Sequence, residues 1–119
     1  MKKRTGFSDL RDTLRRFAAD RDWDQYHSPK NLAAALIVEA AELLEHFQWM
    51  TEAESKVLSA KERARVREEM ADVLIYLVRL ADKLDVDLLE AARQKIKQNA
   101  LKYPIDKAKG SSRKYSDLD

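Results

Sequence analysis

Apolar side chains recur at the three- and four-residue spacing of an α-helix through four stretches of this chain, with few residues to interrupt them. Only two glycines and two prolines are present, whereas a sheet protein of 119 residues needs many tight turns. Apolar residues make up 45% and charged residues 37% of the chain, which is typical of long amphipathic helices. The sequence therefore predicts one all-α domain.

Capping residues and prolines mark the ends of the expected helices. We expect a first helix at about 8–21, a second at 29–50, a third at 60–83, and a fourth between the Asp87 cap and Pro104, which cannot continue a helix. Further caps are predicted at Ser28, before Pro29, and in two capping boxes, Thr51 with Glu54 and Ser59 with Glu62, which bracket a short helical turn.

The links between these helices are short, which predicts a four-helix bundle. The helical domain is expected to span 1–104, and 105–119 are expected to form a basic, polar C-terminal tail without helical periodicity. The second and third helices carry wider apolar stripes than one subunit of this size need bury. We therefore expect the bundle to be the subunit of an oligomer.

Two pairs of acidic residues border the apolar seams of the second and third predicted helices. Glu39 falls inside the apolar sector of its helix, and Glu42 lies one turn further on the same flank. Glu69 and Asp72 repeat this spacing at the edge of the other seam, whereas Glu68 points toward solvent. Because both seams should face the bundle core, four carboxylates are expected to converge there.

Carboxylates gathered at a helix interface need a compensating charge, because desolvation is costly and mutual repulsion raises their pKa values. A divalent cation can supply it, and a shell of oxygen ligands favours Mg²⁺, with Mn²⁺ or Ca²⁺ as substitutes. We expect one or more ions per site, because four carboxylates carry excess charge for a single ion. A di-iron site is not expected, because neither His27 nor His46 completes the Glu-x-x-His motif of such bundles. Zinc is disfavoured by the lack of sulfur ligands.

Two other interpretations stay open from the residues alone. Acidic pairs at this spacing are common on solvated helix faces, and the chain would then be a non-catalytic helical protein-interaction module. A nucleic-acid binder is the less favoured alternative. The net charge is only +2, no reading motif is recognised, and inward-facing acids repel phosphate.

The sequence also bears on location. No cysteine is present, so neither a disulfide framework nor thiolate chemistry is expected. The basic N-terminus is interrupted by charge too often to form a signal peptide, and no apolar run approaches the roughly 20 residues of a membrane span. We therefore expect a small soluble, cytoplasmic protein with no membrane partner.

Taken together, the motifs resemble the all-α nucleoside triphosphate pyrophosphohydrolases of the MazG-like type, and most closely their dCTP pyrophosphatase branch. The acids at Glu39-x-x-Glu42 and Glu69-x-x-Asp72 are separated by 26 residues. The segments that support the resemblance are RDWDQYHSPKNL, EAAELLEHFQWM, EEMADVLIYLV, the N-x-x-x-Y-P ending and SSRKYSDL.

The resemblance implies Mg²⁺-dependent hydrolysis of a nucleoside triphosphate, dCTP or a related or modified dNTP, to the monophosphate and pyrophosphate. This reaction clears surplus or non-canonical nucleotides from the pool. It also implies a homo-oligomer, with a tetramer favoured over a dimer, and no nucleic-acid partner. The preferred base stays open, because Leu14 stands where some relatives carry a pocket histidine.

The resemblance assigns roles residue by residue. Glu39, Glu42, Glu69 and Asp72 fall on the metal ligands, and either Glu39 or Glu42 is expected to accept the proton of the attacking water. The residues expected to contact the nucleotide are Trp23, His27, Asn31, Trp49, Tyr76, Lys95, Asn99 and Tyr103.

Overall fold

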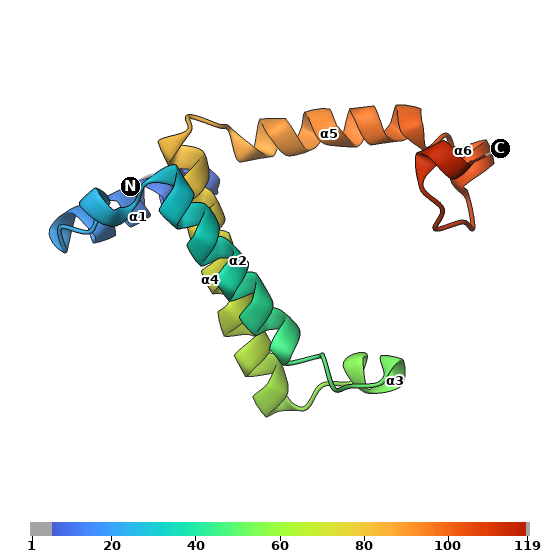
Figure 1. The fold of residues 1–119 in the computed structure, drawn as a ribbon, viewed down its shortest axis with the longest axis horizontal. Helices are drawn as coiled ribbons and strands as arrows, with labels where there is room; N and C mark the ends of the chain where they lie inside the picture. The colour runs from blue at the N-terminus through green and yellow to red at the C-terminus, as the bar shows by residue number, and fades with distance from the viewer. Residues whose placement is uncertain (1–5, 119) are drawn as a thin grey trace, which may run out of the picture. The chain divides into compact units, whose positions relative to one another are not determined.

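The computed structural model describes residues 6–118, and all the regular secondary structure in that range is helical. The chain divides into two compact units, 1–86 and 87–119. The first unit contains α1 (Phe7–Asp20), η1 (Asp24–Tyr26), α2 (Pro29–Glu45), α3 (Glu52–Ser55) and α4 (Ala60–Lys83), and the second contains α5 (Leu88–Lys102), α6 (Ile105–Ala108) and η2 (Tyr115–Asp117) (Figure 1). The predicted all-α class is confirmed, while the four-helix bundle, its oligomer and the 1–104 domain boundary stay predictions.

In the first unit, α2 and α4 run side by side in opposite directions, and α1 packs against α4 (Figure 1). Apolar residues from all three helices are buried between them, namely Ala18, Leu32, Val66, Val78 and Ala81. The seam predicted for α4 comprised Val66, Met70, Val73, Leu77 and Leu84. Of these only Val66 is buried, while Met70 and Leu84 are more than half exposed. A small apolar core therefore holds α1, α2 and α4 together and fixes the faces of α2 and α4 that meet.

The caps predicted at Ser28, Thr51, Ser59 and Asp87 are present, whereas Ser8, expected to open the first helix, lies inside α1, which follows Gly6 without a side-chain cap. The Ser28 hydroxyl accepts the N–H of Asn31 at the start of α2, with Pro29 in the first helical position. Both capping boxes are formed, at Thr51 for α3 and at Ser59 for α4. The Asp87 carboxylate accepts the N–H of Glu90 at the start of α5. These caps explain why the expected starts of α2, α4 and α5 are confirmed.

The C-terminal end of α2 differs from the prediction. The helix was expected to reach Met50, but it ends at Glu45 and continues as a series of turns. The N–H groups of His46 and Phe47 donate to carbonyls three residues back rather than four. These shorter-range hydrogen bonds end the helix and turn the chain away from its axis, so that Thr51 can act as the N-cap of α3.

The C-terminal residues also carry more structure than their composition indicates. Residues 105–108 form α6, and residues 115–117 form η2. The Tyr115 ring stands edge-on to the Tyr103 ring, with 6.1 Å between ring centroids. The backbone N–H of Tyr115 donates to the Tyr103 hydroxyl at 3.2 Å. The Lys102 ammonium lies 4.8 Å from the centre of the Tyr115 ring. The expected featureless tail is thus folded back on the end of α5.

Two sequence expectations concern the ends of the chain and membranes. The basic N-terminal segment lies partly outside the described residues, since residues 1–5 are among those left out. Across residues 6–118, no helix combines the length and the apolar character needed to cross a bilayer.

Candidate functional site

Three of the four predicted acids converge between α2 and α4. Each of Glu39, Glu69 and Asp72 offers a carboxylate oxygen within 4.8 Å of the others. Glu39 comes from the middle of α2, and Glu69 and Asp72 lie one turn apart on α4. Because the two helices run side by side, acids at the border of each apolar seam meet across the interface.

The cluster leaves carboxylate oxygens without partners. Glu39 Oε2 and Glu69 Oε2 are both buried, and neither has a hydrogen-bond partner. Burial raises the pKa of Glu39 to about 7, helped by its hydrogen bond to Glu42 and by the charges of Glu42, Asp72 and Glu69. Buried acceptors of this kind are costly unless a cation or a donor reaches them.

Glu42 lies beside this cluster rather than within it. Its side chain interacts with Glu39, its neighbour one turn away on α2, but it is absent from the set of mutually close oxygens. The structure therefore gathers three of the four expected carboxylates, and the fourth, Glu42, is hydrogen-bonded to Glu39.

One nitrogen approaches the acids. His46 Nε2 lies 3.8 Å from Glu69 Oε1, and both side chains are partly buried. Otherwise the ligand set is carboxylate oxygen only, which suits a hard cation such as Mg²⁺ and does not suit zinc or copper. The two buried oxygens without partners fit such a cation, so Glu39, Glu69 and Asp72 are the residues that could hold it.

A cavity of about 360 Å³ opens next to the acids. Glu39 and Asp72 lie in its wall, and much of the rest is apolar or aromatic. Three residues expected to contact a nucleotide, Trp23, His27 and Tyr76, line this cavity. Leu14, which stands where some relatives carry a pocket histidine, lies in the wall too. The wall also contains residues that the sequence did not mark as functional, namely Phe17, Ala18, Ile75 and Arg79.

The connector between α1 and α2 brings two of these side chains to the cavity. The Trp23 ring stands edge-on to Phe17, 5.7 Å between centroids, which ties the start of the connector to α1. At its other end, Asn31 Nδ2 donates to the Tyr26 carbonyl at 3.0 Å. Asn31, which was expected to contact the substrate, therefore makes a hydrogen bond that stabilises the turn before α2.

The other expected substrate contacts belong to other segments of the chain. Trp49 is 89% exposed in the turns that follow α2 and does not line the cavity. Lys95 and Asn99 lie on α5, and Tyr103 follows it, so all three belong to the second unit. Within that unit, the Tyr103 hydroxyl accepts a bond from the Tyr115 backbone.

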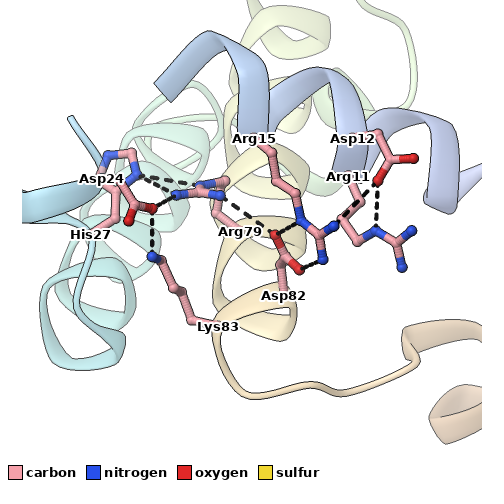
Figure 2. Close-up of polar contacts among 8 residues, drawn as sticks. All are labelled: Arg11, Asp12, Arg15, Asp24, His27, Arg79, Asp82 and Lys83. Carbon is pink, nitrogen blue, oxygen red and sulfur yellow. Dashed lines mark hydrogen bonds and ion pairs between the residues drawn. The ribbon is translucent and has the colours of Figure 1, made fainter. Parts of the chain in front are cut away.

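Arg79 is the largest omission of the sequence analysis. It is only 4% exposed, it lines the cavity, and it stands at the centre of a charge network (Figure 2). The network alternates cations and anions from α1, the connector and α4, and its members are Arg11, Asp12, Arg15, Asp24, Arg79, Asp82 and Lys83. The signal that could have found Arg79 is the one that identified Glu39, a charged residue in the apolar seam of a helix.

Comparisons with known proteins agree with the resemblance seen in the sequence. The family model described as MazG-like matches residues 35–118. The chain is 47% identical to dCTP pyrophosphatase 1 of Rattus norvegicus and 48% identical to that of Homo sapiens, each over 112 residues. Each alignment covers 92% of this chain, and the chain spans 66% of the length of these curated relatives.

A solved structure is similar as well. The crystal structure of a pyrophosphatase from Archaeoglobus fulgidus superposes with a TM-score of 0.80 and is 41% identical in sequence. The match covers 87% of this chain and 97% of the archaeal one.

Proposed function

This chain belongs to the MazG-like family, and we propose that it hydrolyses a nucleoside triphosphate, dCTP or a related or modified dNTP, to the monophosphate and pyrophosphate. Its similarity to proteins named dCTP pyrophosphatase 1 and to an archaeal pyrophosphatase supports the reaction class. The single observation that carries the proposal is a cluster of three carboxylates, two of which line a cavity with aromatic walls.

The cavity suits the nucleoside part of such a substrate. Its volume of about 360 Å³ falls within the range of small-molecule sites, and its walls are largely apolar. We propose that Trp23 and Tyr76 contact the base by their rings, and that His27 supplies a polar contact. The triphosphate would then extend toward Glu39 and Asp72, which line one side of the same cavity.

The acids would hold Mg²⁺, with Mn²⁺ as a possible substitute. Glu39, Glu69 and Asp72 are the proposed ligands, and Glu42 is proposed to join them or to orient Glu39 through their hydrogen bond. When bound, the cation neutralises charge on the phosphate oxygens and makes a water a better nucleophile.

The protein's own groups have two tasks in this proposal. Water attacks the α-phosphorus, the bond to the bridging oxygen breaks, and pyrophosphate leaves. Either Glu39 or Glu42 accepts the proton of the attacking water. The acids and the cavity wall hold the triphosphate in line for this attack, which is the main contribution a protein makes to phosphoryl chemistry.

The remaining predicted contacts stay part of the proposal. Asn31 and Trp49 are proposed to contact the nucleotide, and Lys95, Asn99 and Tyr103 to contact its phosphates and sugar. Removal of unwanted deoxynucleotides from the pool is the proposed role, and the cytoplasm its proposed place. The active unit is proposed to be a homotetramer in preference to a dimer, acting without nucleic acid or membrane.

Pyrophosphate release from a panel of canonical and modified dNTPs, with Mg²⁺ and then with chelator, tests the proposal. The matched variants are Glu69→Gln, in the acid cluster, and Glu68→Gln, its exposed neighbour on α4. Glu69→Gln should lower kcat/KM by about 100-fold or more, whereas Glu68→Gln should leave it unchanged. No release from any member of the panel, or equal activity of the two variants, would contradict the proposal.

A further inference from the structure

Arg79 lines the cavity but is not free to bind a ligand there. Nε and Nη2 both approach His27 Nδ1, at 3.3 and 3.1 Å. Nη2 also donates to Asp24 Oδ1 at 3.0 Å, and Nη1 lies 3.5 Å from Asp82 Oδ2. Each nitrogen of the guanidinium thus has a partner within the protein, so its charge is already committed.

The pairing determines the protonation of His27. A guanidinium nitrogen only donates hydrogen bonds, so Nδ1 must accept and cannot carry a proton. The ring proton is then on Nε2, which becomes the remaining polar group of a side chain that lines the cavity. Burial and the neighbouring Arg79 lower the pKa of His27, which agrees with a neutral ring.

The same residue ties three elements together. Asp24 and His27 belong to the connector, Arg79 and Asp82 to α4, and Asp82 in turn pairs with Arg15 of α1 (Figure 2). Arg79 lies on α4 close to Ile75 and Tyr76, which also line the cavity. Because Arg79 binds Asp24 and His27, it holds the connector at the wall of the cavity.

We infer that Arg79 is a positioning residue: it holds His27 as the Nε2–H tautomer, so that the cavity presents a neutral hydrogen-bond donor to an acceptor atom of the nucleoside. The role in substrate binding rests on the proposed function, but the tautomer does not. A neutral donor suits a carbonyl, ring-nitrogen or sugar oxygen acceptor rather than a phosphate, which the acids and their cation would take.

The variants are chosen so that the fold keeps its other ion pairs. Arg79→Met retains the length of the side chain and removes its donors, while Asp24 keeps Lys83 and Asp82 keeps Arg15 as partners. Lys83→Met is the matched control, because Lys83 pairs with the same Asp24 carboxylate but makes no hydrogen bond to His27. Circular dichroism and thermal unfolding compare the three proteins.

Nitrogen-15 NMR of the imidazoles at neutral pH reads the tautomer directly, with His46→Gln used to assign the two histidines. In the parent, the His27 Nδ1 signal should be that of an unprotonated, pyridine-like nitrogen. In Arg79→Met it should move away from that value as Nδ1 takes up a proton in part of the population, and in Lys83→Met it should stay. A protonated Nδ1 in the parent overturns the inference without any variant.

Steady-state kinetics on the best dNTP of the panel give the second readout. Arg79→Met should raise KM about tenfold and change kcat by less than about threefold, because the lost interaction binds substrate rather than the transition state. Lys83→Met should leave KM unchanged. A higher KM with an unmoved Nδ1 signal would instead make Arg79 a direct substrate contact and overturn the positioning role. If no dNTP is hydrolysed, the proposed function fails, while the NMR result still decides the tautomer.

Discussion

At the scale of single residues, the chain buries charge in two ways. Arg79 is surrounded by acceptors from its own chain, so its burial is compensated without a ligand. Glu39 and Glu69 each keep a buried oxygen with no partner, so their compensation must come from outside the chain. A satisfied buried charge indicates a structural or positioning role, and an unsatisfied one indicates a binding site.

Removal of one acid from the cluster should therefore make the metal-free protein more stable. In Glu39→Gln, a neutral amide replaces a buried carboxylate that faces Glu69 and Asp72, and the gain should be roughly 1–2 kcal/mol. Thermal unfolding with chelator should show a higher Tm for Glu39→Gln than for the parent, and Mg²⁺ should raise the Tm of the parent but not that of Glu39→Gln. Glu45→Gln, an exposed position on α2, should behave like the parent, and a Tm of Glu39→Gln below the parent's would contradict the repulsion.

The Asp82 carboxylate should make stability depend on acid pH. The Arg15 guanidinium hydrogen-bonded to it holds its pKa below the usual 3.8, and Arg79 and Arg11 also lower it. Because the pKa is lower in the folded protein, the stabilisation is complete above about pH 4 and is lost as the pH falls through the folded value. Asp82→Asn should cost roughly 1–3 kcal/mol at pH 7.

That cost can be measured by denaturant unfolding at pH 7 and at pH 3. The difference between parent and Asp82→Asn should shrink at the lower pH, where the parent carboxylate begins to take up its proton. Asp20→Asn, at the exposed last residue of α1, provides a surface control. A difference that is equal at both pH values would show that Asp82 acts by packing rather than by charge.

At the scale of elements, the sequence predicts best where a side chain bonds to a neighbouring backbone group. The caps at Ser28, Ser59 and Asp87 are local and appeared at the expected residues. The end of α2 lacks such a signal, because helical spacing continues past Glu45 and only the hydrogen-bond pattern shows the change to turns. The folding of the tail depends on the contact between Tyr103 and Tyr115, twelve residues apart, which spacing does not reveal.

Removal of the Ser59 cap tests how much its hydrogen bond contributes to the stability of α4. The Ser59 hydroxyl accepts the N–H of Glu62 at 3.1 Å, at the start of the helix that carries Glu69 and Asp72. Ser59→Ala should destabilise the first unit by about 1 kcal/mol, and Ser59→Asp, which keeps an acceptor, should not. Denaturant unfolding followed by helical signal measures both variants. If Ser59→Ala and Ser59→Asp lose equal stability, the effect comes from the surroundings of residue 59 and not from the lost hydrogen bond.

At the scale of the whole molecule, the candidate site shows where prediction from sequence stops. The acids of α2 and α4 could be found because each is anomalous within its own helix, and helical spacing gives their face. Arg79 is anomalous within its helix as well, but its role follows from its partners His27 and Asp24 in the connector, which lie more than 50 positions away in the chain. The cavity wall at Leu14 and Phe17 is likewise a product of packing between α1 and α4.

The exposed apolar face of α2 should be an interface with further copies of the chain. Ile37 and Leu44, two turns apart on α2, are 67% and 61% exposed, and Met70 of α4 is 57% exposed. Large apolar side chains exposed in this way are unfavourable in a lone subunit. We expect the parent to have the mass of a homotetramer of the 13.8 kDa chain by light scattering coupled to size-exclusion chromatography. Ile37→Glu should shift it to smaller species, because a carboxylate cannot be buried there without a partner. Lys30→Glu, which also introduces a carboxylate but at an exposed polar position, should keep the parent mass. A parent that elutes as a monomer, or an Ile37→Glu variant of unchanged mass, would show that this face of α2 is not the interface.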